Sequence, residues 1–202
     1  MSFSLRRSPF LSFAVLAVLV SACASPIRPR GIDSEGLVVG RLKSVNPLEV
    51  VVPRIENKTG KTNLPLDVMR DDFQKGLVAL RYSPLSLDFV DRNVKATEAS
   101  YSPGTLGEQA TLKVVLTNWD SSRWSSHATL VVDADVYLLD ANDPDPSHAL
   151  WGGHTTRSVD LSRQRQQFIS DEAMLRRAVE LTVDGILVAL PSRDPEKAPT
   201  TR

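Results

Sequence analysis

The longest alternating segment of the sequence runs from His127 to Asp140 and reads HATLVVDADVYLLD. Asp133 and Asp135 share one face of this segment, and apolar side chains occupy the other. Apolar residues at every second position are typical of a β-strand with one buried face; here they are Leu130, Val132, Ala134, Val136 and Leu138. The segment therefore predicts a long strand in a sheet that has one packed face and one wet face.

Two further alternating segments flank this strand. ATLKVVLTNW begins at Ala110, and ALWGGHTTRSVDL begins at Ala149. The short polar segments DSSRWSS and ANDPDPSH connect the three. Consecutive strands with short connections predict an antiparallel meander.

A βαβ unit is predicted before the meander. LEVVVP (48–53) is expected to be a strand, and its unbroken valines indicate that both of its faces are covered. A helix is expected over 64–80, with Asn63 or Thr62 as its cap. Its apolar residues recur every three or four positions; they are Leu66, Met69, Phe73, Leu77 and Leu80. LSLDFVD (85–91) is expected to be the second strand, and residues 37–42 are an uncertain short extra strand.

The last helix is expected to begin after Ser170, with Asp171 and Glu172 in its first turn, where the helix dipole favours acids. Its apolar stripe comprises Leu175, Ala178, Val179, Ile186, Ala189 and Leu190. The predicted fold class is α/β (α+β): a βαβ unit, then an antiparallel β-meander and a C-terminal helix. The sheet is mixed, with helices packed on it.

The N-terminal region has the pattern of an export signal. MSFSLRR is basic, and residues 10–22 are apolar or small, which is too short a segment for the roughly 20 residues that span a bilayer. The only cysteine of the chain, Cys23, follows at once. We therefore expect a signal peptide at 1–22, a lipidated N-terminus and linker at 23–46, a single α/β domain at 47–191, and a polar tail at 192–202.

The sequence VSAC, from Val20 to Cys23, resembles the lipobox of bacterial lipoproteins. The resemblance implies cleavage between Ala22 and Cys23, a diacylglycerol thioether on Cys23, and an acyl chain such as palmitate on its amine. More than one chain makes anchoring stable. Ala24 at the next position resembles the signal for transfer to the outer membrane, so the periplasmic face of that membrane is the expected location.

Composition and motifs argue against nucleic acids and nucleotides. The 24 basic residues balance the 24 acidic ones, which leaves no basic excess for nucleic acid. ENKTGKTNLP (56–65) follows a strand and precedes a helix, as a phosphate-binding loop does. However, a Walker A motif needs glycine five positions before Gly60, where this chain has Ile55. Pro53, Asn57 and Thr59 are instead expected to shape a turn through side-chain hydrogen bonds to the backbone.

No catalytic or metal-binding motif is complete. DANDPDP begins like a calcium loop, but its sixth and twelfth positions hold Asp145 and Trp151 in place of glycine and glutamate. Glu108, Asp133 and Asp135 are the remaining candidate acids. We expect a protein that is not an enzyme, with no metal and no cofactor apart from the covalent lipid on Cys23.

The segment NWDSSRW holds the most suggestive exposed feature. Trp119 and Trp124 flank a polar turn that contains Arg123. These three residues are candidates for a partner-binding hot spot. The alternative is that the tryptophans pack across the meander and close one end of the core.

The order of these elements resembles a group of periplasmic lipoproteins that includes the curli-secretion and penicillin-binding-protein activator lipoproteins. Their α/β domain is similar to the N-terminal domain of the Tol-system translocation protein. The residues that carry the resemblance are Pro53, Asn57, Thr59, Leu139, Asp140 and Trp151. No segment resembles the transmembrane hairpins of the curli-secretion pore.

The resemblance implies a lipid-anchored, non-catalytic binding or assembly module that docks an envelope protein. Two alternatives stay open: an accessory lipoprotein of lipopolysaccharide transport, and, less favoured, a hydrolase of envelope polymers. The identity of the partner and the oligomeric state also stay open.

Overall fold

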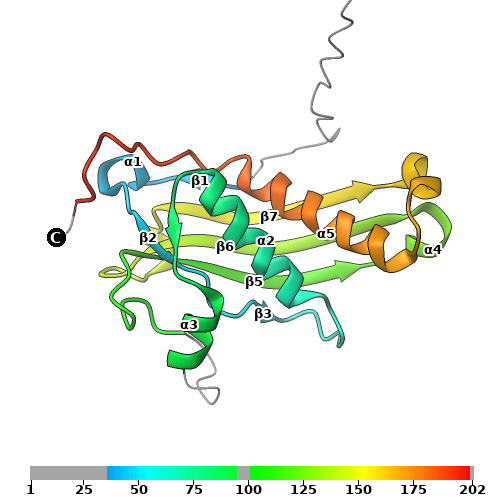
Figure 1. The fold of residues 1–202 in the computed structure, drawn as a ribbon, viewed down its shortest axis with the longest axis horizontal. Helices are drawn as coiled ribbons and strands as arrows, with labels where there is room; N and C mark the ends of the chain where they lie inside the picture. Colours follow the sequence, from blue (N-terminus) through cyan, green and yellow to red (C-terminus); the bar gives the residue numbers. More distant parts are fainter. Residues whose placement is uncertain (1–35, 95–100, 201–202) are drawn as a thin grey trace, which may run out of the picture.

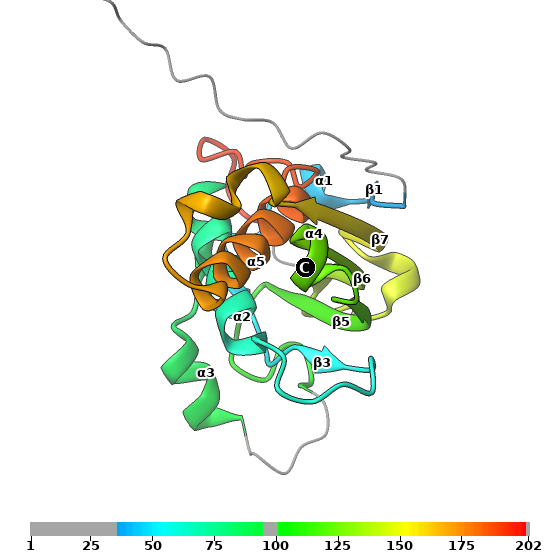
Figure 2. The same ribbon diagram turned by 90° about the vertical axis from the view of Figure 1, so that its right-hand side faces the viewer.

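The computed structural model describes residues 36–94 and 101–200. The predicted signal peptide and Cys23 lie outside these residues. The described residues form a seven-stranded mixed sheet in the order β1-β7-β6-β5-β2-β4, with β3 beside β5 (Figure 1). Two long helices, α2 and α5, lie on one face of this sheet (Figure 2). The predicted α/β fold class is confirmed.

The meander is the largest part of the sheet. It consists of β5 (Ala110–Asp120), β6 (Thr129–Asp140) and β7 (Trp151–Asp160), which pair antiparallel as predicted. The apolar positions of β6 are buried against the helices, and Asp133 and Asp135 lie half-buried on the opposite face, which we call the back face. The predicted wet face is therefore confirmed.

Two short strands share one edge of β5. β2 (Glu49–Val51) pairs parallel with the start of β5, and β3 (Glu56–Asn57) pairs parallel with its middle. β4 (Ser83–Pro84) pairs parallel with β2. The β2–α2–β4 order confirms the βαβ unit.

The core lies between the sheet and the pair formed by α2 (Leu66–Ala79) and α5 (Asp171–Leu187). Ser170 caps α5 as predicted, since its hydroxyl accepts a hydrogen bond from the Ala173 amide at 3.1 Å. The helices approach closely at Gly76, where a Cβ would clash with Leu187. The largest fully buried side chains include Trp151, Phe73, Met69, Leu77, Leu112, Leu116, Leu130, Leu138 and Met174.

The prediction of a strand at 85–91 is wrong. β4 ends at Pro84, and α3 (Leu87–Asn93) follows, with the Ser86 hydroxyl accepting a hydrogen bond from the Phe89 amide. The segment alternates apolar and polar residues, but Leu87 and Val90 also have helical spacing, and this is the pair that packs inward. The Ser86 cap favours the helical spacing over the strand alternation, because it stabilises the first turn of α3.

The predicted cap of α2 is also wrong. Neither Asn63 nor Thr62 caps the helix; Pro65 occupies the N-cap position without a side-chain hydrogen bond. Asn63 adopts the left-handed conformation, with φ of 58°, so the chain turns there and the helix begins at Leu66.

The folded domain extends into the segments expected to be linker and tail. β1 (Val38–Val39) pairs antiparallel with β7, and α1 (Leu42–Val45) follows it. Buried Asn46 donates hydrogen bonds to the carbonyls of Asp194 and Lys197 and accepts one from the Asp194 amide. The buried side chain of Asn46 therefore holds the C-terminal segment against α1. The polar composition of that segment did not predict this contact.

Tyr82 also holds the C-terminal segment in place. Its hydroxyl donates to the Pro191 carbonyl at 2.8 Å, and burial raises the pKa of Tyr82 to about 12. The C-terminal segment thus packs as part of the domain.

A buried arginine attaches α3 to the rest of the fold. Arg70 lies in α2 with its side chain 4% exposed, and it contacts both oxygens of Asp91 at 2.8 and 3.0 Å. Its Nε donates to the Val52 carbonyl at the end of β2. One guanidinium therefore joins α2, α3 and β2.

Replacing Asp91 with alanine leaves this buried charge without its carboxylate. We expect Asp91→Ala to lower the free energy of unfolding by about 2 to 3 kcal/mol, the usual range for hydrogen bonds to charged groups. The matched control is Asp88→Ala, because Asp88 lies exposed in the same helix. Chemical denaturation measures both, and equal losses would contradict the role given to Arg70.

Candidate functional site

The end of the sheet where β5 and β7 terminate carries most of the candidate binding residues. We define the distal tip as residues 121–127 and 161–170. It contains the short helix α4 (Trp124–His127) and the 3-10 helix η2 (Ser162–Gln167). It forms the right-hand end of the molecule in Figure 1.

Two similar turns build the distal tip. The Asp120 carboxylate accepts a hydrogen bond from the Ser122 amide, and the Asp160 carboxylate accepts one from the Ser162 amide, each at 2.8 Å. These hydrogen bonds hold the pKa of each aspartate below its ordinary value, and nearby Arg123 adds to both effects. Both carboxylates therefore stay ionised and fix the direction in which the chain leaves its strand.

The two halves of the distal tip contact each other. Arg165 donates from Nη1 to the Ser125 carbonyl at 2.8 Å, which joins η2 to α4. Ile169 follows η2 and is 98% exposed, and Arg123, Arg163 and Arg165 are exposed as well. Among the described residues, the distal tip thus presents an aliphatic side chain together with several guanidinium groups.

Trp119 does not belong to this exposed surface. It is 4% exposed and lies in the core. The reason is a register shift in β5 between Leu116 and Asn118, which adds one residue to the strand and turns Trp119 toward the helices. For Trp119, therefore, the alternative of packing into the core is the one that the structure has.

Trp124 and Arg123 remain candidates for partner binding. Trp124 is half-buried and packs against the core, whereas Arg123 is exposed beside it. Their role in partner binding stays a prediction. Trp151 is fully buried and donates from its indole nitrogen to the Ala189 carbonyl.

Glu108 is not brought together with Asp133 and Asp135, which are neighbours on the back face of β6. On the back face, Asp133 accepts a hydrogen bond from Asn118 at 3.1 Å, and Asp135 contacts His154 at 2.8 Å. Glu108 contacts Thr111 instead, and Thr111 pairs with Leu139 on β6. Leu139 lies four residues from Asp135, which is about 13 Å along a strand.

Glu108 organises the loop that precedes β5. It is 4% exposed and accepts hydrogen bonds from the Tyr101 hydroxyl, the amides of Gly104 and Leu106, and the Thr111 hydroxyl. Burial, together with the hydrogen bond to Glu108, raises the pKa of Tyr101. The sequence marks Glu108 only as a candidate acid; the turn residues Gly104 and Gly107 around it are the signal for this fixed loop.

The turn at Asn57 has the predicted hydrogen bonds. The Asn57 side chain donates to the Lys61 carbonyl and accepts from the Thr59 amide, and the Thr59 hydroxyl accepts from the Lys61 amide. Asn57 and Thr59 thus shape the connection from β3 to α2. Pro53 lies between β2 and β3 and is buried.

Two cavities lie at the end of the sheet opposite the distal tip. One, of about 280 Å³, is lined by Glu108, Asp140 and Thr200 among others; another, of about 450 Å³, is lined by Arg41, Asp143 and His148 among others. Asp133 and Asp135 line neither. Residues 36–94 and 101–200 contain no group of three His, Cys, Asp or Glu side chains suited to a metal ion. Nor do they contain a helix with the length and apolarity to cross a bilayer.

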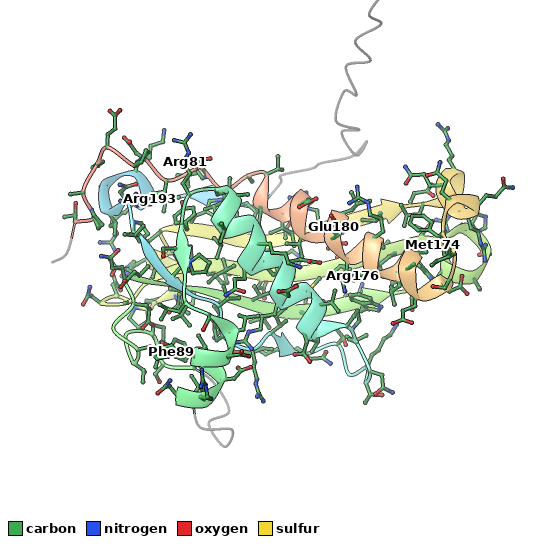
Figure 3. The ribbon with its side chains drawn as sticks, in the orientation of Figure 1. Arg81, Phe89, Met174, Arg176, Glu180 and Arg193 are labelled. Atoms are coloured by element: carbon green, nitrogen blue, oxygen red, sulfur yellow. The ribbon has the colours of Figure 1, made fainter. Side chains whose placement is uncertain are left out.

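Carboxylates also gather where α2 meets α5. Burial raises the pKa of Asp72 above its ordinary value, and Glu180 adds to this while Lys75 opposes it. Burial likewise raises the pKa of Asp184, again with a contribution from Glu180. Figure 3 shows Glu180 and Arg176 on α5. Because an acid with a raised pKa binds protons more readily in the folded chain, ionising it lowers the free energy of unfolding.

We expect Asp72→Asn to stabilise the domain at pH 7. The raised pKa of Asp72 means that stability falls as the pH rises from the unfolded value, 3.8, through the folded one, and stays lower above it. The gain from the amide should therefore shrink as the pH approaches 3.8. Denaturation midpoints across pH measure it, with Asp67→Asn as the exposed control on the same helix; an equal gain in both variants would contradict the assignment.

Neither a protein-family model nor a curated protein matches the chain. Among solved structures it is similar to the PelC dodecamer from Paraburkholderia phytofirmans, with 13% identity and a TM-score of 0.49 over 78% of this chain and 96% of that one. It is also similar to lipoprotein GNA1162 from Neisseria meningitidis, with 18% identity and a TM-score of 0.47 over 71% and 99%. A third is the hypothetical protein CT253 from Chlamydia trachomatis, with 11% identity and a TM-score of 0.48 over 75% and 99%.

Proposed function

We propose that this chain is a lipid-anchored lipoprotein of the bacterial envelope, whose α/β domain docks an envelope protein on the periplasmic face of the outer membrane. The observation that carries the proposal is the sequence VSAC, which ends at the only cysteine and directly follows an apolar segment. A thioether-linked diacylglycerol and an acyl chain on Cys23 supply two hydrophobic attachments, enough for stable anchoring.

The proposed role is binding and not catalysis. Glu108 is held by hydrogen bonds within its own loop, away from Asp133 and Asp135, which are neighbours on the back face of β6 and contact Asn118 and His154. General acid–base chemistry needs its groups within reach of one substrate. Because Asp133 and Asp135 line neither of the two cavities described above, the arrangement favours a docking module over a hydrolase.

The distal tip is the proposed docking surface. Ile169 is exposed and follows the exposed Arg163 and Arg165 along the chain; Arg123 and Trp124 lie at the start of α4, which Arg165 contacts. Arginine and large apolar side chains are the residue types that carry binding energy at protein interfaces. Tethering to a membrane raises the effective concentration of this surface toward a partner in the same membrane.

The anchor is tested by replacing Cys23 with serine. We expect Cys23→Ser to abolish incorporation of a labelled fatty acid and to move the protein out of the membrane fraction, because serine forms no thioether. The matched control, Ser25→Ala, should keep both. Labelling and fractionation that survive in Cys23→Ser would contradict the anchor.

The docking surface is tested by photo-crosslinking in membranes from a probe placed at Ser126, which is exposed on α4. We expect Arg123→Glu and Ile169→Ser each to reduce the crosslinked partner about tenfold, since a hot-spot residue contributes more than 1 kcal/mol. Val78→Ser is the control, because Val78 is exposed on α2, away from the distal tip. An unchanged yield of crosslinked partner in both distal-tip variants would show that the docking surface lies elsewhere.

A further inference from the structure

The distal tip carries positive charge and no negative charge of its own. Residues 121–127 and 161–170 contain Arg123, Arg163 and Arg165 but neither aspartate nor glutamate, although the whole chain has 24 basic and 24 acidic residues. All three arginines are exposed. The distal tip is therefore a local excess of positive charge on a chain whose formal charges balance.

The carboxylates nearest in sequence to the distal tip already have roles in the fold. Asp120 and Asp160 each accept a hydrogen bond from a turn amide at the end of a strand. Asp171 and Glu172 lie in the first turn of α5, where the helix dipole favours acids. These carboxylates border the distal tip, while its own residues supply the guanidinium groups.

The arginines of the distal tip differ from several other exposed basic residues in having no carboxylate partner. Arg41 contacts Asp143 at 2.9 Å, and Lys113 contacts Glu56 at 3.2 Å. In the part of the chain that the structure describes, no arginine of the distal tip forms such an ion pair. A guanidinium can bind a carboxylate through two parallel hydrogen bonds. The distal tip therefore presents this binding capacity at its surface.

Ile169 projects from a segment that the fold holds in place. The preceding residue, Phe168, packs against the core, and its amide donates to the Arg165 carbonyl at 3.3 Å. Arg165 in turn donates from Nη1 to the Ser125 carbonyl on α4. Ile169 is nevertheless 98% exposed. Because burial removes such a side chain from water, an apolar pocket on another molecule would bind it favourably.

We propose that the distal tip binds an acidic surface of its protein partner, where Arg163 and Arg165 contact carboxylates and Ile169 enters an apolar pocket beside them. This inference rests on the proposed docking function and specifies the chemistry of the partner. Opposite charges at an interface speed association and exclude partners of the wrong charge. The contact from Arg165 to Ser125 fixes the two halves of the distal tip before binding, which lowers the cost of ordering them.

Charge substitutions at Arg163 test the inference in membranes, by photo-crosslinking from the probe at Ser126. Arg163 is exposed, and no hydrogen bond from its side chain stabilises the described part of the chain, so its variants should fold. We expect Arg163→Lys to lower the yield of crosslinked protein about twofold, Arg163→Gln about fivefold and Arg163→Glu more than about tenfold, because the yield follows the charge. Arg81→Glu is the control, because Arg81 is exposed near the opposite end of the domain (Figure 3).

The crosslinked product supplies a second measurement. Mass spectrometry should place the contact beside aspartate or glutamate residues of the partner. Replacing those carboxylates with lysine should lower the yield for the unsubstituted chain and raise it about tenfold for Arg163→Glu, because the facing charges are then opposite again. Ile169→Leu should keep the yield that Ile169→Ser loses, since leucine suits an apolar pocket of similar volume.

Equal yields for Arg163→Lys, Arg163→Gln and Arg163→Glu would overturn the inference, and so would a contact on the partner that lacks carboxylates. If Arg123→Glu and Ile169→Ser still reduce crosslinking in that case, the docking function stands and only the acidic partner is wrong. A product that contains lipid and no protein, or no product at all, would contradict both the docking function and the inference.

Discussion

The shared pairing of β5 is the constraint on which the rest of the structure depends. β6 pairs along its whole length, while β2 and β3 divide the opposite edge between them. The connection to α2 starts from β3 on this edge, and the connection to α3 starts from β4, which pairs with β2. The register shift after Leu116 then turns Trp119 into the core and leaves Asp120 to begin the distal tip. The one extra residue in β5 is therefore the reason why Trp119 is buried and does not join the exposed surface of the distal tip.

The helices cover only one face of the sheet, so the two faces of the domain differ in character. Because α2 and α5 both pack on one side (Figure 2), the opposite face keeps polar side chains such as Asp133 and Asp135. The distal tip follows directly from the ends of β5 and β7, at Asp120 and Asp160. The sheet itself therefore positions the proposed docking surface.

Long periodic segments predicted the meander, α2 and α5, because a buried face imposes its period on the sequence. Short segments did not predict their own structure as well. Residues 85–91 fit both the alternation of a strand and the spacing of a helix. The cap at Ser86 and the contact from Arg70 to Asp91 favour the helix. The burial of Trp119 stayed open as one of two alternatives, since alternation gives no sign of an added residue. Glu108 and Asn46 were missed because each acts through backbone groups distant in the fold or loop, which a linear pattern does not bring together.

The central claim is that the domain is held at a membrane through its N-terminal cysteine. Intact-mass spectrometry of the protein extracted from membranes with detergent measures this directly. The account predicts a chain that begins at Cys23 and carries a diacylglycerol and an acyl chain. A mature chain that begins elsewhere, or one that begins at Cys23 without lipid, would contradict it.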